Sequence, residues 1–308
     1  MPSVVIGLIW AIAFVVLESV QFVYFGGLFQ HVNSFLFGFC VLGLTSAFFI
    51  GMAWLRTPEQ VRLAFQNLGL LLKVNATAAF AWIAFLGSVQ LIEPAIAYTI
   101  GAGVMPITAF LLHRFGWPEG EAMRNKTELY GNVIVACAIL LLCVITLADL
   151  SGFVRGGAGT AILGVAFAIA DGVLFTMLLA YCQRMDRSGV GPGAVFGLRF
   201  PLYVLTAGLF AFATMTPADL PTAPTLITAI VVGTALIVPP LYALQRAVAL
   251  IPTMTLSAIT ATGPFVIFAL QIAEGRVAQS GITLFGLCLY FTGAIVAATG
   301  AVKATIES

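Results

Sequence analysis

The sequence predicts an all-α integral membrane protein with ten transmembrane helices, arranged as two inverted five-helix repeats. Of its 308 residues, 61% are hydrophobic and 8% are charged, whereas a soluble domain has about 25% charged residues. The apolar residues form ten long runs separated by short links. One stretch, Gly87–Phe115, recurs at Gln245–Ala273 with its prolines in matching places. These observations exclude a water-soluble domain and indicate an internal duplication.

The duplication is carried by two pairs of prolines. Pro94 maps onto Pro252 and Pro106 onto Pro264, both with an offset of 158 residues. Because proline fits the first turn of a helix, the first member of each pair predicts a helix start. The second member lies inside the following apolar run, where it removes a hydrogen bond and predicts a kink.

The boundaries of the spans follow from length, because a membrane-spanning helix needs about 20 mostly apolar residues. The first run has no basic segment or small-residue cleavage site before it, so we expect a retained helix and no signal peptide. The longest links leave no room for a soluble domain. The ten predicted helices cover residues 4–25, 32–54, 70–91, 94–115, 129–149, 158–182, 194–215, 225–245, 252–273 and 280–302.

Lysine and arginine set the expected orientation, because cytoplasmic loops are enriched in both. With the N-terminus inside, the outer loops hold only Arg155 and Arg276. We therefore expect a multi-pass protein of the plasma (inner) membrane with both termini cytoplasmic. The cytoplasmic links and tail hold Arg56, Arg62, Lys73, Arg114, Arg124, Lys126, Arg184, Arg187, Arg246 and Lys303.

The halves, residues 1–150 and 156–308, each contain an odd number of predicted helices. The second half therefore enters the membrane upside down relative to the first. Inverted repeats are typical of secondary transporters, whose substrate site lies near the midplane between the repeats. We expect a cavity there, lined by the first, third, fourth, sixth, eighth and ninth helices, with the fifth and tenth peripheral. A glycine stripe, Gly286, Gly293 and Gly300, predicts that the last helix packs closely against another helix.

Three ionisable residues lie within predicted spans, where charged groups are costly and often functional. Glu18 and Asp171 each lie roughly 20 Å from opposite faces of the membrane, as inverted equivalents would. Each is a candidate proton carrier or ligand for a substrate ammonium, or else a member of a structural ion pair, for instance Asp171 with Arg199. Arg199 is a candidate clamp for a substrate carboxylate, because its planar fork suits that group. The alternative for Arg199 is snorkelling to headgroups or pinning a helix end.

Polar and aromatic residues near the repeated stretches are further candidates. Tyr98 and Thr99 in the fourth predicted helix and Thr260 in the ninth either line a polar cavity or allow close helix packing. Trp82 and Tyr242 either stack on a substrate or pack in the protein interior.

Prolines within helices are candidates for gating. Pro239 and Pro240 interrupt the hydrogen bonding of the eighth predicted helix, and Pro106 and Pro264 kink the fourth and ninth. Freed backbone carbonyls are tolerated in a membrane only where protein or water covers them. Each proline therefore marks a gate or binding segment, or a simple kink.

Other classes of function receive little support. The net charge of +1 gives no sign of nucleic-acid binding, and no segment resembles a nucleotide-binding loop. We expect no metal and no cofactor, because the two histidines, His31 and His113, lie at helix ends. An intramembrane aspartyl protease would need two membrane aspartates, and only Asp171 is well placed. The five cysteines lie in apolar runs and are expected to be small buried hydrophobes.

Several motifs resemble one transporter family. They are Gly197-Leu-Arg199-Phe200 at a helix start, the internal prolines of the fourth and ninth helices, and Glu274-Gly-Arg276 before a glycine-rich last helix. With two five-helix halves, the chain resembles the EamA-type transporters of the drug/metabolite transporter superfamily along nearly its whole length. The first half has Phe39-Cys40 or Cys40-Val41 in place of Arg199-Phe200, so a role for that arginine would not be duplicated.

The resemblance implies export of small metabolites such as amino acids, aromatic ones included, by alternating access. The expected partners are a small-molecule substrate and the lipid bilayer, with protons as an open option, and the protein is not expected to be an enzyme. A passive channel or facilitator for small solutes, and an intramembrane enzyme, are the alternatives. The substrate, the coupling ion, the direction of transport and the oligomeric state stay open.

Overall fold

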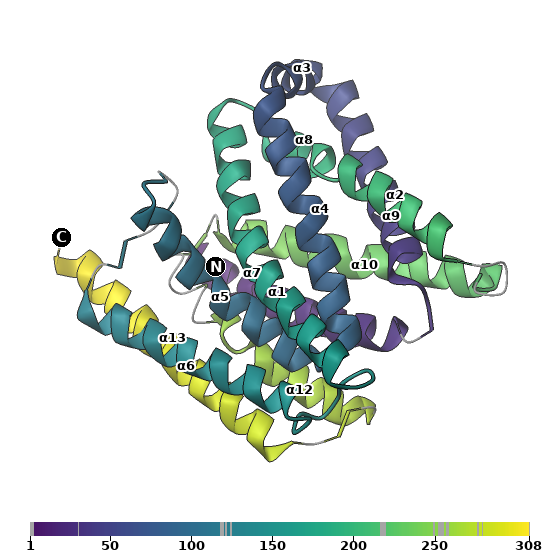
Figure 1. Cartoon of the computed structure of the whole chain (residues 1–308). Helices are drawn as coiled ribbons and strands as arrows, with labels where there is room; N and C mark the ends of the chain where they lie inside the picture. The colour runs from purple at the N-terminus through teal and green to yellow at the C-terminus, as the bar shows by residue number, and fades with distance from the viewer. Residues whose placement is uncertain are drawn as a thin grey trace.

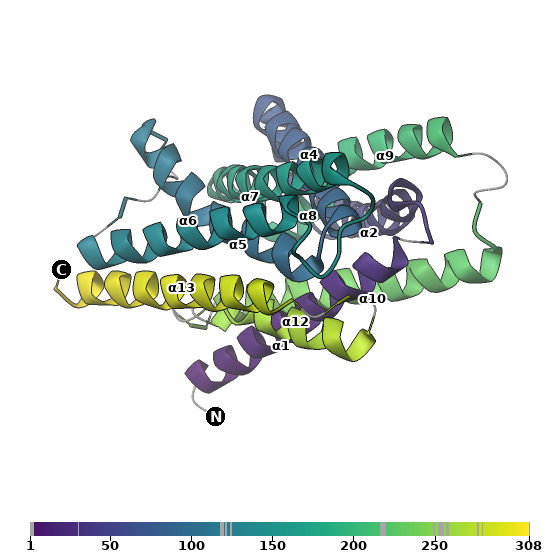
Figure 2. The same cartoon turned by 60° about the horizontal axis from the view of Figure 1, so that its bottom comes forward.

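The protein is described by a computed structural model of the whole chain, in which helices pack into one bundle (Figures 1 and 2). Within the described residues the only β contact is an isolated bridge between Ile92 and Val154. The structure describes residues 3–29, 31–117, 120, 122–123, 125–215, 220–248, 250–251, 256, 259–275, 277–278 and 280–307. The helices are α1 (Ser3–Leu28), α2 (Ser34–Arg56), α3 (Pro58–Gln66), α4 (Leu68–Leu91), α5 (Pro94–Arg114), α6 (Lys126–Leu147), α7 (Ala158–Arg187), α8 (Pro192–Leu198), α9 (Pro201–Thr214), α10 (Ala223–Val248), α12 (Gly263–Glu274) and α13 (Gly281–Glu307).

The predicted class, a helical protein with many membrane spans, is confirmed. In the described part of the chain, nine helical segments are long and apolar enough to cross a membrane, and α12 is a shorter apolar helix. Many large apolar side chains point outward, among them Phe48 (60% exposed), Phe80 (59%) and Leu140 (67%). A soluble protein rarely exposes such surfaces, whereas lipid covers them at no cost.

Two of the differences from the predicted spans concern the link after α2 and the seventh span. The link after α2 contains α3, an amphipathic helix that begins at Pro58 and buries Val61 and Ala64. The seventh predicted span is divided into α8 and α9 at Arg199 and Phe200. Proline has no N–H to continue the α8 ladder, so Pro201 at the start of α9 explains this break.

The prolines within helices act differently from one another. Pro106 lies inside α5, and Pro239 and Pro240 lie inside α10, and both helices continue through them. Pro239 and Pro240 therefore remove two backbone donors from the eighth predicted helix without ending it. Pro264 stands in the first turn of α12 after a turn at residues 261–262, so it begins a helix and does not kink one. Pro252 lies outside the described residues.

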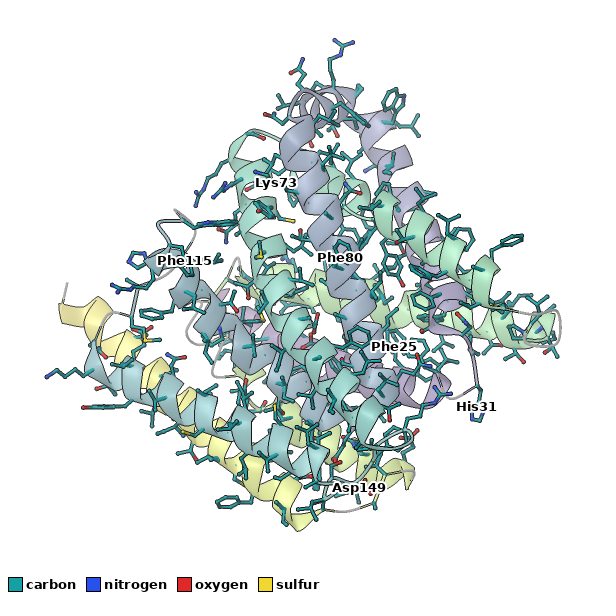
Figure 3. All side chains as sticks on the ribbon, viewed as in Figure 1. Phe25, His31, Lys73, Phe80, Phe115 and Asp149 are labelled. Atoms are coloured by element: carbon teal, nitrogen blue, oxygen red, sulfur yellow. The ribbon has the colours of Figure 1, made fainter. Side chains whose placement is uncertain are left out.

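Different interhelical links lie at the two ends of the bundle. At one end, marked by His31 and Asp149 in Figure 3, the link between α6 and α7 touches two other junctions. The Arg155 N–H donates to the Leu91 carbonyl (2.8 Å), and the Ala278 N–H donates to the Gly152 carbonyl (3.1 Å). We call this the linker end.

The opposite end, marked by Lys73 and Phe115 in Figure 3, holds most of the described lysines and arginines. Here the Gly191 N–H donates to the Gln60 side chain (3.1 Å), and the Arg184 guanidinium lies 5.3 Å from the centre of the Trp117 ring. We call this the basic end.

Helices α6 and α13 lie side by side in both views (Figures 1 and 2) and run antiparallel. A methyl group on Gly131 of α6 would collide with the Ala297 backbone nitrogen of α13. On α13, similar methyl groups would lie 2.5 Å from Leu142 at Gly286 and 2.7 Å from the Val135 nitrogen at Gly293. The prediction that the glycine stripe packs against another helix is confirmed.

A second close approach joins α2 to α9. Tyr203 is fully buried, and its hydroxyl has no hydrogen-bond partner among the residues that the structure describes. A methyl group on Gly38 would collide with that hydroxyl. We expect Gly38→Ala to destabilise the protein by about 2 kcal/mol, because overpacking a tight contact forces side chains off their rotamers. Adding Tyr203→Phe should recover part of this loss, and Tyr203→Phe alone should not destabilise, because the lost hydroxyl is unpaired. Thermal unfolding in detergent measures all three variants, and a double variant as unstable as Gly38→Ala would contradict this account.

Candidate functional site

Glu18 and Tyr98 form the centre of the candidate site. Glu18 lies on α1, and its Oε2 atom accepts a hydrogen bond from the Tyr98 hydroxyl of α5 (3.1 Å). The same hydroxyl lies 3.4 Å from the Thr260 backbone carbonyl, so it joins both halves of the chain. Glu18 lies among protein groups, and its side chain is half-buried.

Asp171 lies on α7, which packs against α5. Its carboxylate faces Gly101 of α5, where a methyl group would lie 3.1 Å from Oδ2. Asp171 and Glu18 are close enough to interact electrostatically, and the Tyr290 hydroxyl of α13 also lies in range of Glu18. The two carboxylates predicted from the sequence are therefore brought together around α5. Tyr290 is an addition that the sequence analysis missed.

Arg199 is held by other groups. Its guanidinium lies 4.4 Å from the ring centre of Phe196 and 4.7 Å from that of Phe200, and Cys182 of α7 is a polar neighbour. No ion pair joins Arg199 to Asp171, both of which the structure describes. Cys182 lies three turns beyond Asp171 on α7, roughly 16 Å along the axis. The arginine therefore pins the junction of α8 and α9 to α7.

The remaining candidates separate into interior, surface and helix-internal positions. Trp82 is 9% exposed and packs edge-on against Phe85 (5.4 Å between ring centres), as a core residue does. Tyr242 is 53% exposed and contacts Trp10, away from the carboxylates. Thr99 is buried and donates to a carbonyl of its own helix (2.6 Å). Among the polar and aromatic candidates, Tyr98 and Thr260 are the ones that lie beside Glu18.

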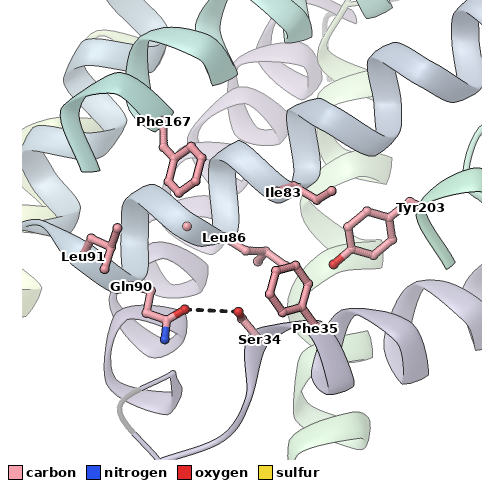
Figure 4. Close-up of a pocket in the computed structure, with 9 residues that line it drawn as sticks. Ser34, Phe35, Ile83, Leu86, Gln90, Leu91, Phe167 and Tyr203 are labelled. Atoms are coloured by element: carbon pink, nitrogen blue, oxygen red, sulfur yellow. Dashed lines mark hydrogen bonds between the residues drawn. The ribbon is translucent and has the colours of Figure 1, made fainter. Parts of the chain in front are cut away.

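One pocket in the described part of the molecule lies elsewhere (Figure 4). It encloses about 160 Å³ between α2, α4, α7 and α9. Ser34 and Gln90 form a hydrogen bond across it (3.1 Å), and Phe35, Phe167 and Tyr203 supply apolar walls. None of the predicted site residues lines this pocket, which differs from the expected midplane cavity in the helices that form it.

A third buried carboxylate lies at the linker end. Glu93, between α4 and α5, is fully buried and accepts from the Gly152 N–H (2.8 Å). The Gln271 amide of α12 lies 3.4 Å from Oε1, and the Thr283 hydroxyl of α13 lies 3.5 Å from Oε2. Burial raises the pKa of Glu93 to about 7, and the three hydrogen bonds partly offset this rise.

Glu93 was missed because it precedes Pro94 at a predicted helix junction, which normally lies in water. The repeat contained a signal, because Ile251 stands in the equivalent position before Pro252. A charged residue without a counterpart in the other repeat marks a place where the halves differ.

Comparison with known proteins supports the fold alone. No family model and no curated protein matches this chain. A solved structure described only as "Crystal structure of protein" superposes with a TM-score of 0.63 and is 18% identical in sequence, and the match covers 96% of this chain and 96% of that chain. A protein of similar length therefore has this arrangement of helices.

Proposed function

We propose that this protein is a secondary transporter of the EamA type, which moves small metabolites by alternating access to a site around Glu18 and Asp171. The observation that carries the proposal is the meeting of these two carboxylates with Tyr98 around α5. In the proposed arrangement the chain crosses the membrane ten times, with α8 and α9 forming one span and α12 belonging to the ninth. Its halves, residues 1–150 and 156–308, are inverted repeats.

The pairing of helices supports the repeat. If each span of the first half corresponds to the span five later, the contact of α4 with α7 becomes the contact of α10 with α1. In the same way α5 with α7 becomes α12 with α1, and α4 with α9 becomes α10 with α2. All six contacts occur, and the pairs α6–α13, α2–α9 and α5–α12 correspond to themselves.

The glycines of α6 and α13 support the inversion. Gly131 corresponds to Gly286 with an offset of 155 residues, and the same offset relates Leu142 to Ala297. The repeat therefore maps the contact of Gly131 with Ala297 onto the contact of Gly286 with Leu142, and both contacts occur. Two helices related by a two-fold axis run antiparallel when that axis is perpendicular to them. For helices that span a membrane, such an axis lies in the membrane plane, as in the inverted repeats of transporters.

The distribution of the core supports a conformation that is closed at the linker end. One large cluster of buried residues there joins spans of both halves, including Phe25, Ile92 and Ile267. Among the described residues of the basic end, the buried side chains form separate clusters of α2, α3, α4, α7 and α8 and of α1 with α10. If the basic end is cytoplasmic, as the lysine and arginine bias predicts, this is an inward-open state of a plasma (inner) membrane protein.

The chemistry of the central groups favours a substrate with an amino group. Carboxylates and tyrosine hydroxyls bind an ammonium through charge-assisted hydrogen bonds, which are stronger than neutral ones. Amino acids, aromatic ones included, fit this chemistry and the resemblance to exporters. Protons are the alternative occupant of the same carboxylates and would provide coupling.

Counterflow in proteoliposomes tests the proposal. Vesicles containing the purified protein and loaded with an unlabelled amino acid or amine should accumulate the labelled compound transiently, several-fold above protein-free vesicles. A panel of amino acids and amines identifies the substrate. Equilibration at the same rate with and without internal substrate would indicate a passive facilitator. Absence of uptake for the whole panel would contradict transport of this class of substrate.

A further inference from the structure

Glu93 joins four segments at the linker end of the bundle. It lies at the junction of α4 and α5 and contacts the link between α6 and α7 through Gly152, α12 through Gln271, and α13 through Thr283. Gln271 strengthens this junction, because its side-chain oxygen accepts from the Ala95 N–H (3.0 Å). Glu93, Gln271 and Thr283 are each at most 1% exposed, so the contacts close this end against water.

The groups that face Glu93 identify its ligand. The Gly152 N–H and the Gln271 amide are donors, and the Gln271 oxygen is already occupied by Ala95. A metal cation needs several oxygen ligands, and these donors would repel it. The three donors favour the carboxylate, whereas complete burial disfavours its charge, and a proton removes that cost. The neutral carboxyl group can still accept from Gly152 and can donate to the Thr283 hydroxyl.

No charged neighbour compensates the carboxylate within the described residues. The Arg155 guanidinium is directed to the Phe29 carbonyl (3.1 Å). The proton affinity of Glu93 is therefore set mainly by burial and not by a salt bridge to any described residue. The other charged or titratable residues of the surrounding links are His31, Asp149 and Glu274, none of which is a described partner of Glu93, and Arg276, which lies outside the described residues.

We propose that Glu93 is a proton-binding latch, which holds the linker end closed while its carboxyl group is neutral and releases it when the proton leaves. Its role as a gate in transport rests on the proposed function, whereas the latch itself can be measured without transport. Opening this end would hydrate the carboxylate and remove the cost of burying its charge.

The direction of the pH effect follows from linkage. Burial raises the pKa of Glu93 from 4.5 to about 7 in the closed arrangement, and hydration would return it toward 4.5. The closed arrangement therefore binds the proton more tightly than the open one. Its advantage is complete at pH values below 4.5, and it is lost progressively as the pH rises through about 7.

Hydrogen exchange of the purified full-length protein, without substrate, tests the latch between pH 5.5 and 8.5. Peptides covering residues 92–97 and 148–157 report on this end. Glu93→Gln mimics the protonated state, and dividing the wild-type exchange rates by those of the variant removes the intrinsic effect of pH. We expect this ratio to rise more than about tenfold from the acidic to the alkaline limit, because the charge on Glu93 then favours opening.

Asp149→Asn is the matched control, because it removes an exposed carboxylate at the same end and should leave the pH profile unchanged. If Glu93→Gln does not fold, wild-type peptides of this end are compared with the peptide of residues 58–66 at the basic end. A ratio that is independent of pH, or an identical effect of Asp149→Asn, overturns the latch. If the exchange ratio depends on pH but the protein shows no counterflow, the latch stands and the transport proposal alone is contradicted.

Discussion

Glu18→Gln and Asp171→Asn should each lower the rate of counterflow about ten- to a hundredfold, because a hydrogen bond to a charged group is worth about 1.5–3 kcal/mol. Both amides preserve size, and the glutamine oxygen can still accept from Tyr98, so the fold should survive. If either carboxylate carries the proton, the dependence of the rate on pH should also flatten in that variant. Initial rates in proteoliposomes at several pH values measure both effects.

Glu59→Gln is the matched control for Glu18→Gln, because Glu59 is exposed on α3. The double variant Asp171→Asn with Arg199→Ala supplies a second comparison. Because no ion pair joins these residues, removing Arg199 should not restore the activity lost with Asp171. Full activity and unchanged pH profiles in both single variants would make the carboxylates structural. Recovery in the double variant would show that the two charges are coupled.

Gly131→Ala should lower the stability of the protein by about 3 kcal/mol, near the upper end of the usual cost of overpacking. The new methyl group would collide with the Ala297 backbone nitrogen of α13, which cannot rotate away as a side chain can. The helices α6 and α13 would have to separate along their length. Thermal or denaturant unfolding in detergent measures the loss.

Gly51→Ala on α2 is the matched control, because nothing lies within 4 Å of the methyl group that it adds. Alanine is a better helix former than glycine, so this variant should be neutral or slightly stabilising. Equal losses in both variants would indicate that backbone freedom, not the α6–α13 contact, decides the cost. No loss in Gly131→Ala would contradict the close approach of the two helices.

Much of the architecture could be read from composition and periodicity. A chain with 8% charged residues must be covered by lipid, and apolar runs of spanning length mark the helices. The glycines of α13 indicated a close helix contact, and the rarity of Glu18 and Asp171 within apolar spans marked them as candidates. The helical class and the glycine contact are confirmed, because each depends on local sequence and on the properties of the bilayer. The role of the two carboxylates stays a prediction.

The tertiary structure decided which residues meet. Tyr98 reaches Glu18 only because α1 packs beside α5, and Arg199 lies against Phe196 and Phe200 instead of pairing with Asp171. Tyr242 contacts Trp10 near the surface, although the repeat placed it beside a candidate stretch. Spacing within one helix determines the face of a residue, but not which helix covers that face.

Glu93 illustrates the same limit most sharply. By sequence it belongs to a short link, where a carboxylate normally lies in water. Burial results from Gly152, Gln271 and Thr283, which are distant in sequence and converge on it from three other segments. The sequence alone thus determined a membrane-embedded helical protein with rare internal charges. Only the packing of the helices decided which charges share a site and which one is sealed from water, because desolvation depends on neighbours from the whole fold.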